Sequence, residues 1–113
     1  MTILHQLDEL RTGLPGTEVV AYVDLSAGMV LGWSSAMVQP QEWLDALCLT
    51  ASEILGGVEA DTGEAIKLSA TGAMVLLRAP DAPAEALCIV GAPDIDLDAA
   101  RYKARSVLEN VTE

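Results

Sequence analysis

Only a few side chains in this sequence are of the types that nucleophilic or acid–base catalysis uses. His5 is the only histidine, and it lies on the polar side of an expected N-terminal helix with no fixed partner visible in the sequence. A serine or cysteine nucleophile needs a nearby base or cation that activates it, yet the neighbours of Cys48 and Cys88 are apolar. We therefore expect two buried thiols that pack in a hydrophobic core, and we predict no catalytic residue.

The acidic string Asp94-Ile95-Asp96-Leu97-Asp98 is the feature most similar to a metal site. A calcium loop that began there would need Gly at its sixth position and Glu at its twelfth, where this chain has Ala99 and Arg105. The string is therefore interpreted as the cap of a helix. The two cysteines lack the spacing of a zinc site. Because the sequence also lacks the glycine-rich motifs of nucleotide-binding loops, neither a metal ion nor a cofactor is expected.

Length and charge limit the classes of function. The chain has 113 residues, which suits a single domain spanning 1–113. Its net charge of -11 disfavours nucleic acid as a partner, because phosphates would be repelled. The segment Met1–Glu9 lacks the pattern of a secretion signal, and no run approaches the roughly 18 apolar residues that a membrane span needs. We therefore expect a cytoplasmic protein without stable membrane insertion. Its acidic surface fits a basic, membrane or exposed-peptide partner.

The first part of the chain predicts a helix followed by a hairpin. Thr2 can cap a helix that ends at Pro15-Gly16, and its apolar stripe is formed by Ile3, Leu7, Leu10 and Leu14. The β-branched run Thr17–Asp24 predicts a strand, and a turn through Leu25–Gly28 leads to a second strand over Met29–Ser34.

A long central helix is predicted from Pro40 to about Leu55, with Gly56-Gly57 just beyond it. At about 100° per residue one stripe is formed by Leu44, Leu47, Cys48, Ala51 and Leu55. Trp43 and Ile54 extend this stripe on one flank, and Leu49 lies among acidic residues on the opposite side. The additional apolar residues fit two interpretations, contact with a second copy of the chain or a wider contact with the core.

The second half predicts a meander and a last helix. An acidic turn over Glu59–Gly63 precedes strands over Glu64–Ala70, Ala73–Ala79 and Glu85–Gly91, the last after a loop over Pro80–Pro83. The last helix has one apolar face, formed by Leu97, Ala100, Ala104, Val107, Leu108 and Val111. The resulting order, α-β-β-α-β-β-β-α, predicts an α+β fold in which a five-stranded antiparallel sheet has the central helix on one face and both terminal helices on the other.

Half of the positive charges lie close together in the last helix, at Arg101, Lys103 and Arg105. Compensation of the helix dipole explains this position. A small basic contact patch is the alternative.

Two segments resemble the roadblock/dynein light chain family. The first runs from Leu14 to Leu31 and contains a helix end, a strand, a turn with Gly28 and a second strand; the other is the hairpin segment Thr71–Arg78. Ser26-Ala27 before Gly28, and Gly32-Trp33 in the following strand, depart from the family pattern. The resemblance implies a roadblock or profilin-like fold in a bacterial member of the family.

The resemblance further implies a generally non-enzymatic homodimer or heterodimer, whose sheets join edge to edge and whose central helices lie side by side. Ras-like small GTPases, or motor and scaffold subunits, recognise the platform formed in this way. Some bacterial members accelerate GTP hydrolysis by positioning the GTPase's own residues, and no inserted arginine is identified in this chain.

For the dimer contact, our hypothesis is the strand Glu64–Ala70 as an edge that needs a partner, together with the central-helix residues Trp43, Leu47, Leu49 and Ile54. A ligand-sensing domain is the alternative function. Its candidate pocket residues are Tyr22, Trp33 and Thr71. A small enzyme ranks last, because no base, metal or cofactor motif supports one.

Overall fold

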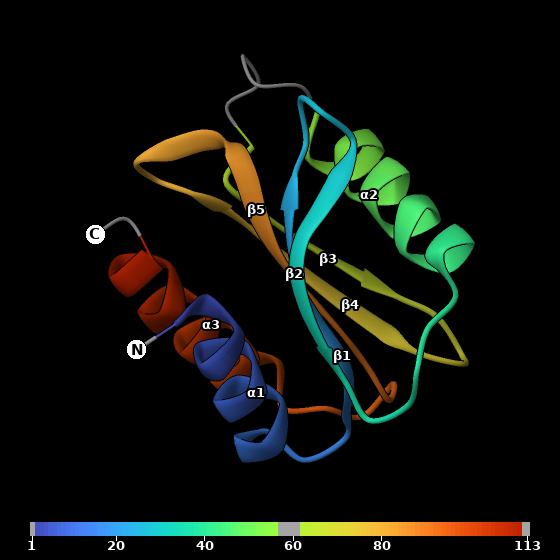
Figure 1. The fold of residues 1–113 in the computed structure, drawn as a ribbon. Helices are drawn as coiled ribbons and strands as arrows, with labels where there is room; N and C mark the ends of the chain where they lie inside the picture. Colours follow the sequence, from blue (N-terminus) through green and yellow to red (C-terminus); the bar gives the residue numbers. More distant parts are fainter. Residues whose placement is uncertain (1, 57–61, 112–113) are drawn as a thin grey trace.

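The computed structural model describes residues 2–56 and 62–111. Within these residues the elements follow the predicted order (Figure 1): α1 (Ile3–Gly13), β1 (Thr17–Asp24), β2 (Met29–Ser35), α2 (Gln41–Leu55), β3 (Glu64–Leu68), β4 (Ala73–Ala79), β5 (Ala82–Gly91) and α3 (Leu97–Val111). Most of the predicted acidic turn, residues 59–61, lies outside the described part of the chain, as does the side chain of Val111.

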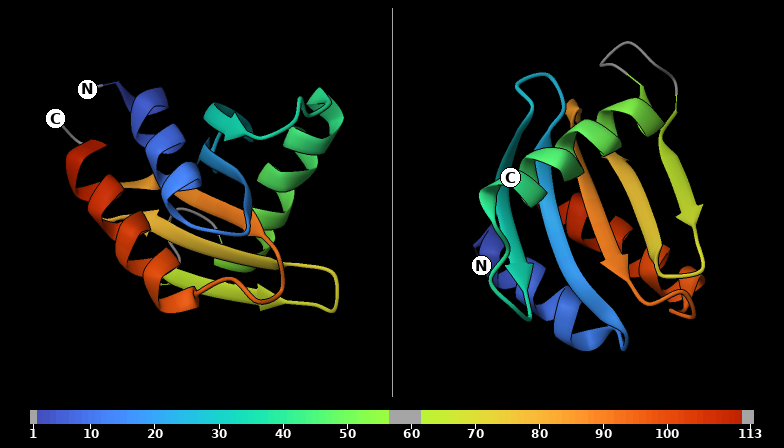
Figure 2. Two further views of the ribbon diagram at one scale, coloured as in Figure 1. Left: turned by 90° about the horizontal axis from the view of Figure 1, so that it is seen from below. Right: turned by 90° about the vertical axis from the view of Figure 1, so that its right-hand side faces the viewer.

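The strands form one antiparallel sheet in the order β2-β1-β5-β4-β3. The helix α2 covers one face of this sheet, and α1 and α3 lie side by side on the other face (Figures 1 and 2). Both the α+β fold class and the predicted placement of the helices are therefore confirmed. The edge strands are β2 and β3, at opposite ends of the sheet.

Each face of the sheet has its own hydrophobic core, because side chains alternate along a strand. In β1, Val20 and Tyr22 face α1 and α3, whereas Ala21 and Val23 face α2. Cys48 and Cys88 are free, buried thiols in the core under α2. The prediction of two buried thiols is confirmed.

Two helix starts follow the predicted capping. The Thr2 hydroxyl accepts a hydrogen bond from the backbone N–H of His5 at 3.2 Å. At α3, the Asp96 carboxylate accepts from the N–H of Ala99 at 3.0 Å. A side-chain oxygen in this position satisfies a backbone donor that the helix itself leaves unpaired, so the acidic string caps a helix through Asp96.

Three boundaries differ from the predictions. β2 extends one residue further, to Ser35. β3 ends at Leu68 instead of Ala70, because the N–H of Ser69 donates to the Gly72 carbonyl at 2.9 Å and closes the turn. β5 begins at Ala82 instead of Glu85. Its Pro83 has no N–H for the ladder and lies beside the register shift between Arg78 and Ala79.

The Arg78 side chain joins three separate segments. Its guanidinium donates to the carbonyls of Thr62 at 2.9 Å, Pro83 at 2.6 Å and Leu55 at 2.9 Å. Leu55 is the last residue of α2, where carbonyls lack helical partners and a cation is favourable. Arg78 therefore fixes the end of α2 and the β4–β5 turn against each other.

We expect Arg78→Met to lower the free energy of unfolding by about 2 kcal/mol, because several charge-assisted hydrogen bonds are lost while the aliphatic stem is kept. The measurement is urea denaturation at one protein concentration. Arg105→Met is the matched control. It removes an exposed ion pair, and such a pair contributes less than about 1 kcal/mol. Equal effects of the two variants would contradict this role of Arg78.

Candidate interaction surfaces

The four residues that were predicted on α2 do not form one surface. Leu47 is only 4% exposed and packs on the sheet, so it is not available for a partner, and its inclusion is wrong. Trp43 and Ile54 are half-buried and pack against the same core, which they widen. Leu49 is 63% exposed and points away from the sheet, since it follows Leu47 by about 200° of helix rotation.

The outer face of α2 combines this exposed leucine with negative charge. Glu42, Asp45 and Glu53 are all exposed on the helix that carries Leu49. A single apolar contact surrounded by carboxylates is suited to a partner surface with a complementary apolar spot and basic residues.

The β3 edge is the second exposed feature. β3 pairs with β4, and in the described part of the chain no other strand pairs with it. Ile66 and Leu68 are exposed, and they pair with Val75 and Ala73, whose side chains face α1 and α3. An edge strand with unpaired backbone groups and exposed apolar side chains is a template for another strand.

Two of the three clustered basic residues are bound within the chain. The Glu64 carboxylate at the start of β3 forms an ion pair with Arg101 and a second one with Arg105, the latter at 2.8 Å. Both arginines precede the last turn of α3, which contains no basic residue, so the helix-dipole interpretation is wrong. Their role is to join α3 to β3. No local pattern identified Glu64 as the partner, because the link depends on where α3 crosses the sheet.

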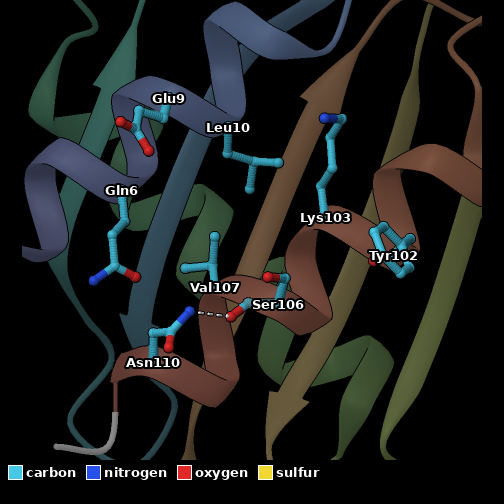
Figure 3. Close-up of a pocket in the computed structure, with 8 residues that line it drawn as sticks. All are labelled: Gln6, Glu9, Leu10, Tyr102, Lys103, Ser106, Val107 and Asn110. Carbon is cyan, nitrogen blue, oxygen red and sulfur yellow. Dashed lines mark hydrogen bonds between the residues drawn. The ribbon is translucent and has the colours of Figure 1, made fainter.

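Lys103 lies on a different side of α3 from these arginines, so the three do not form one patch. It lines a groove of about 670 Å³ between α1 and α3 (Figure 3). Gln6, Glu9 and Leu10 of α1 line one wall, opposite Lys103 and Val107 of α3. Sequence reasoning missed this groove, because it arises where two helices from opposite ends of the chain meet. The charged residues that line the groove are Lys103 and Glu9, so it carries one positive and one negative group.

His5 is exposed, and its Nε2 lies 2.9 Å from a Glu9 carboxylate oxygen one turn further along α1. Glu9 is thus a partner that the sequence analysis did not identify, and the exposure of His5 agrees with the expected surface residue. The thiols are poor nucleophiles: burial is the main cause that raises the pKa of both Cys48 and Cys88. Within residues 2–56 and 62–111, no group of three His, Cys, Asp or Glu side chains is placed to hold a metal ion.

The residues suggested for a ligand pocket do not converge. Trp33 pairs with Ala21, whose side chain faces α2, whereas Tyr22 is buried against α1 and α3. Thr71 lies in the β3–β4 turn at the other end of the sheet. The pocket hypothesis for these three residues is therefore wrong.

Tyr22 instead forms a partly buried pair with Glu85, to which its hydroxyl donates at 2.5 Å. Burial, and then this hydrogen bond, raises the pKa of Tyr22 above its ordinary value. The folded protein therefore keeps the phenol proton at a pH where the unfolded chain, with a pKa of about 10, loses it. The stabilising contribution is complete below that pH and is lost as the pH rises toward the pKa of the folded state.

We expect Tyr22→Phe to make the loss of stability above about pH 10 shallower than in the original protein, because one differential ionisation is removed. Urea denaturation across this alkaline range is the measurement. If the free energy of unfolding fell equally steeply with pH in both proteins, Tyr22 would not contribute to the loss of stability at alkaline pH.

Neither the scan of family models nor the search of curated proteins gives a match. Solved structures do match. A roadblock/LC7 domain from Streptomyces avermitilis aligns with a TM-score of 0.80 at 14% identity, over 96% of this chain and 93% of that one. The chain has the roadblock fold.

Other proteins with the roadblock fold align over nearly as much of the chain. MglC from Myxococcus xanthus has a TM-score of 0.76 at 14% identity, covering 98% of this chain and 97% of its own. MglB from the same organism has a TM-score of 0.74 at 13% identity, covering 97% and 84%. At this identity the match establishes the roadblock fold itself, as the resemblance of Leu14–Leu31 and Thr71–Arg78 predicted.

Proposed function

We propose that this chain is a non-catalytic protein-interaction module that acts as a dimer. The observation that carries the proposal is the roadblock fold together with its exposed β3 edge, where Ile66 and Leu68 accompany unpaired backbone groups. Edge-to-edge pairing of two copies satisfies those groups and covers the two apolar side chains. The family resemblance supports this arrangement, with the two α2 helices side by side near the junction.

The proposed partner is a Ras-like small GTPase or a scaffold subunit. The support comes from the family resemblance and from the structural neighbours, which include MglC, MglB and a Thermus thermophilus MglB that is described as a gliding protein. The acidic outer face of α2 around Leu49 is the surface that we assign to this contact. Within the described residues no helix is long and apolar enough to cross a membrane, and we propose a cytoplasmic location.

An affinity pull-down with either GDP or a non-hydrolysable GTP analogue tests the partner class. We expect a small GTPase to be retained from a lysate of the source organism in one nucleotide state and to be lost with Leu49→Glu. Retention of a large assembly in both states favours the scaffold role. If the chain retains nothing in either nucleotide state, the proposed partner class is wrong.

A further inference from the structure

We propose a second interaction surface at the opposite edge of the sheet, and we infer that it binds an extended segment of a partner protein by adding a strand to β2. The segment has alternating apolar side chains together with lysine or arginine. We call this surface the β2 edge; it comprises strand β2 and the exposed apolar residues Leu4, Met37 and Val38.

β2 lacks the charged residues and the proline that commonly protect an edge strand, although its pairing with β1 has one register shift, between Tyr22 and Val23. Edge strands usually carry charged residues or proline, which prevent unwanted pairing. β3 contains Glu64 and Lys67. The β2 sequence, Met-Val-Leu-Gly-Trp-Ser-Ser, contains no charged residue and no proline. Met29, Leu31 and Trp33 are nevertheless exposed.

Apolar side chains lie on both sides of the position that an added strand would take. α1 contacts β2 on one face of the sheet and α2 on the other (Figure 2). A Cβ on Gly32 would lie 3.3 Å from the Leu4 side chain, which places Leu4 beside the strand on the α1 face. On the α2 face lies Trp33, and Val38, which is 90% exposed, follows in the chain. The alternating apolar side chains of an added strand would therefore meet apolar residues on whichever face of the sheet they lie.

The surrounding charge selects a basic segment over a second copy of this chain. Asp8 hydrogen-bonds to Ser34 near one end of β2, and Asp24 pairs with Met29 at the other end. Arg11 is held by Ser34 at 2.8 Å. Two β2 edges that faced each other would bring Asp8 and Asp24 of both copies to the same junction, whereas lysines or arginines of a partner segment would be attracted to these carboxylates.

The two surfaces are independent of each other. β2 and β3 are opposite edges of one sheet, so a dimer that forms through β3 leaves β2 at the outer end of the joined sheet. Binding at the β2 edge can therefore fail while the proposed dimer holds, or the reverse.

The test uses a peptide of about eight residues, a usual strand length, with alternating valine and lysine, and a control peptide in which serine replaces valine. Both peptides are titrated into the full chain, and binding is followed through backbone amide shifts in NMR spectra. We expect the valine peptide to shift the amides of residues 29–38 and to bind more tightly than the serine peptide, which carries the same charge.

Leu31→Lys is expected to weaken the valine peptide about tenfold, since it places a like charge on the edge. The matched control is Leu68→Lys, because Leu31 is 47% exposed and Leu68 is 58% exposed on opposite edges. It should leave the peptide affinity unchanged. Equal binding of the two peptides, shifts outside the β2 edge, or unchanged affinity in Leu31→Lys would overturn the proposal. The proposal would also be overturned if Leu31→Lys converted a dimer of the original chain into a monomer. The β2 edge would then be occupied by a second copy of the chain and not by a partner segment.

Discussion

Gly91→Ala is expected to lower the free energy of unfolding by about 3 kcal/mol, at the upper end of the cost of overpacking a core. A Cβ at this position would lie 2.6 Å from the Gly16 carbonyl oxygen and 3.2 Å from the Thr17 Cα. Both are backbone atoms. The carbonyl is held in place, because it accepts from the N–H of Ala92 at 2.9 Å and belongs to a glycine at a φ of 87°. The junction of α1, β1 and β5 therefore has no room for a methyl group.

Gly63→Ala is the matched control, because no atom lies within 4 Å of a Cβ built at Gly63. Urea denaturation of both variants, with circular dichroism as the readout, measures the difference. We expect Gly63→Ala to stay within about 0.5 kcal/mol of the original protein. If Gly91→Ala lowered the free energy of unfolding no more than Gly63→Ala does, the close approach of the Gly16 backbone to residue 91 would be contradicted.

Leu68→Lys is expected to dissociate the proposed dimer, with a dissociation constant about a hundredfold higher. Leu68 is exposed on the edge strand β3. A lysine on this edge disfavours strand pairing, and the apolar contact that Leu68 makes across the junction would be lost. Sedimentation equilibrium over a range of concentrations gives the constant.

Leu31→Lys serves as the control for this prediction, because it makes the same change on the opposite edge of the sheet. It should leave the dimer intact. If Leu31→Lys dissociated the dimer and Leu68→Lys did not, the copies would pair through β2 instead. If neither variant had an effect, the dimer contact would lie away from both sheet edges.

The sequence predicted the order of the elements because each one has a local signal. Helical spacing from Leu44 to Leu55 and the β-branched run Thr17–Asp24 identified their elements directly. The boundary at β5 was less accurate, because Pro83 is a usual loop residue that here fits beside a register shift. That irregularity depends on the β4–β5 pairing, which a local pattern does not contain.

The interaction surfaces were predicted less well than the fold. The position of Leu49 around the axis of α2 correctly predicted that it lies on the outside of the helix. The same reasoning did not exclude Leu47 from the partner surface, although Leu47 packs on the sheet. The grouping of Arg101 and Arg105 was visible, whereas their common partner Glu64 was not. The alternation of side chains along β1 separates Tyr22 from its neighbours Ala21 and Val23 in the sequence itself. Whether Trp33 lies on the same face of the sheet as Tyr22 depends on the register between β1 and β2.

The molar mass of the unmodified chain in solution, measured by light scattering at micromolar concentration, tests the proposed dimeric module most directly. The proposal predicts twice the chain mass of 11.9 kDa, with the β3 edges paired. A mass of 11.9 kDa throughout this range would contradict it, because an isolated copy cannot form the joined platform.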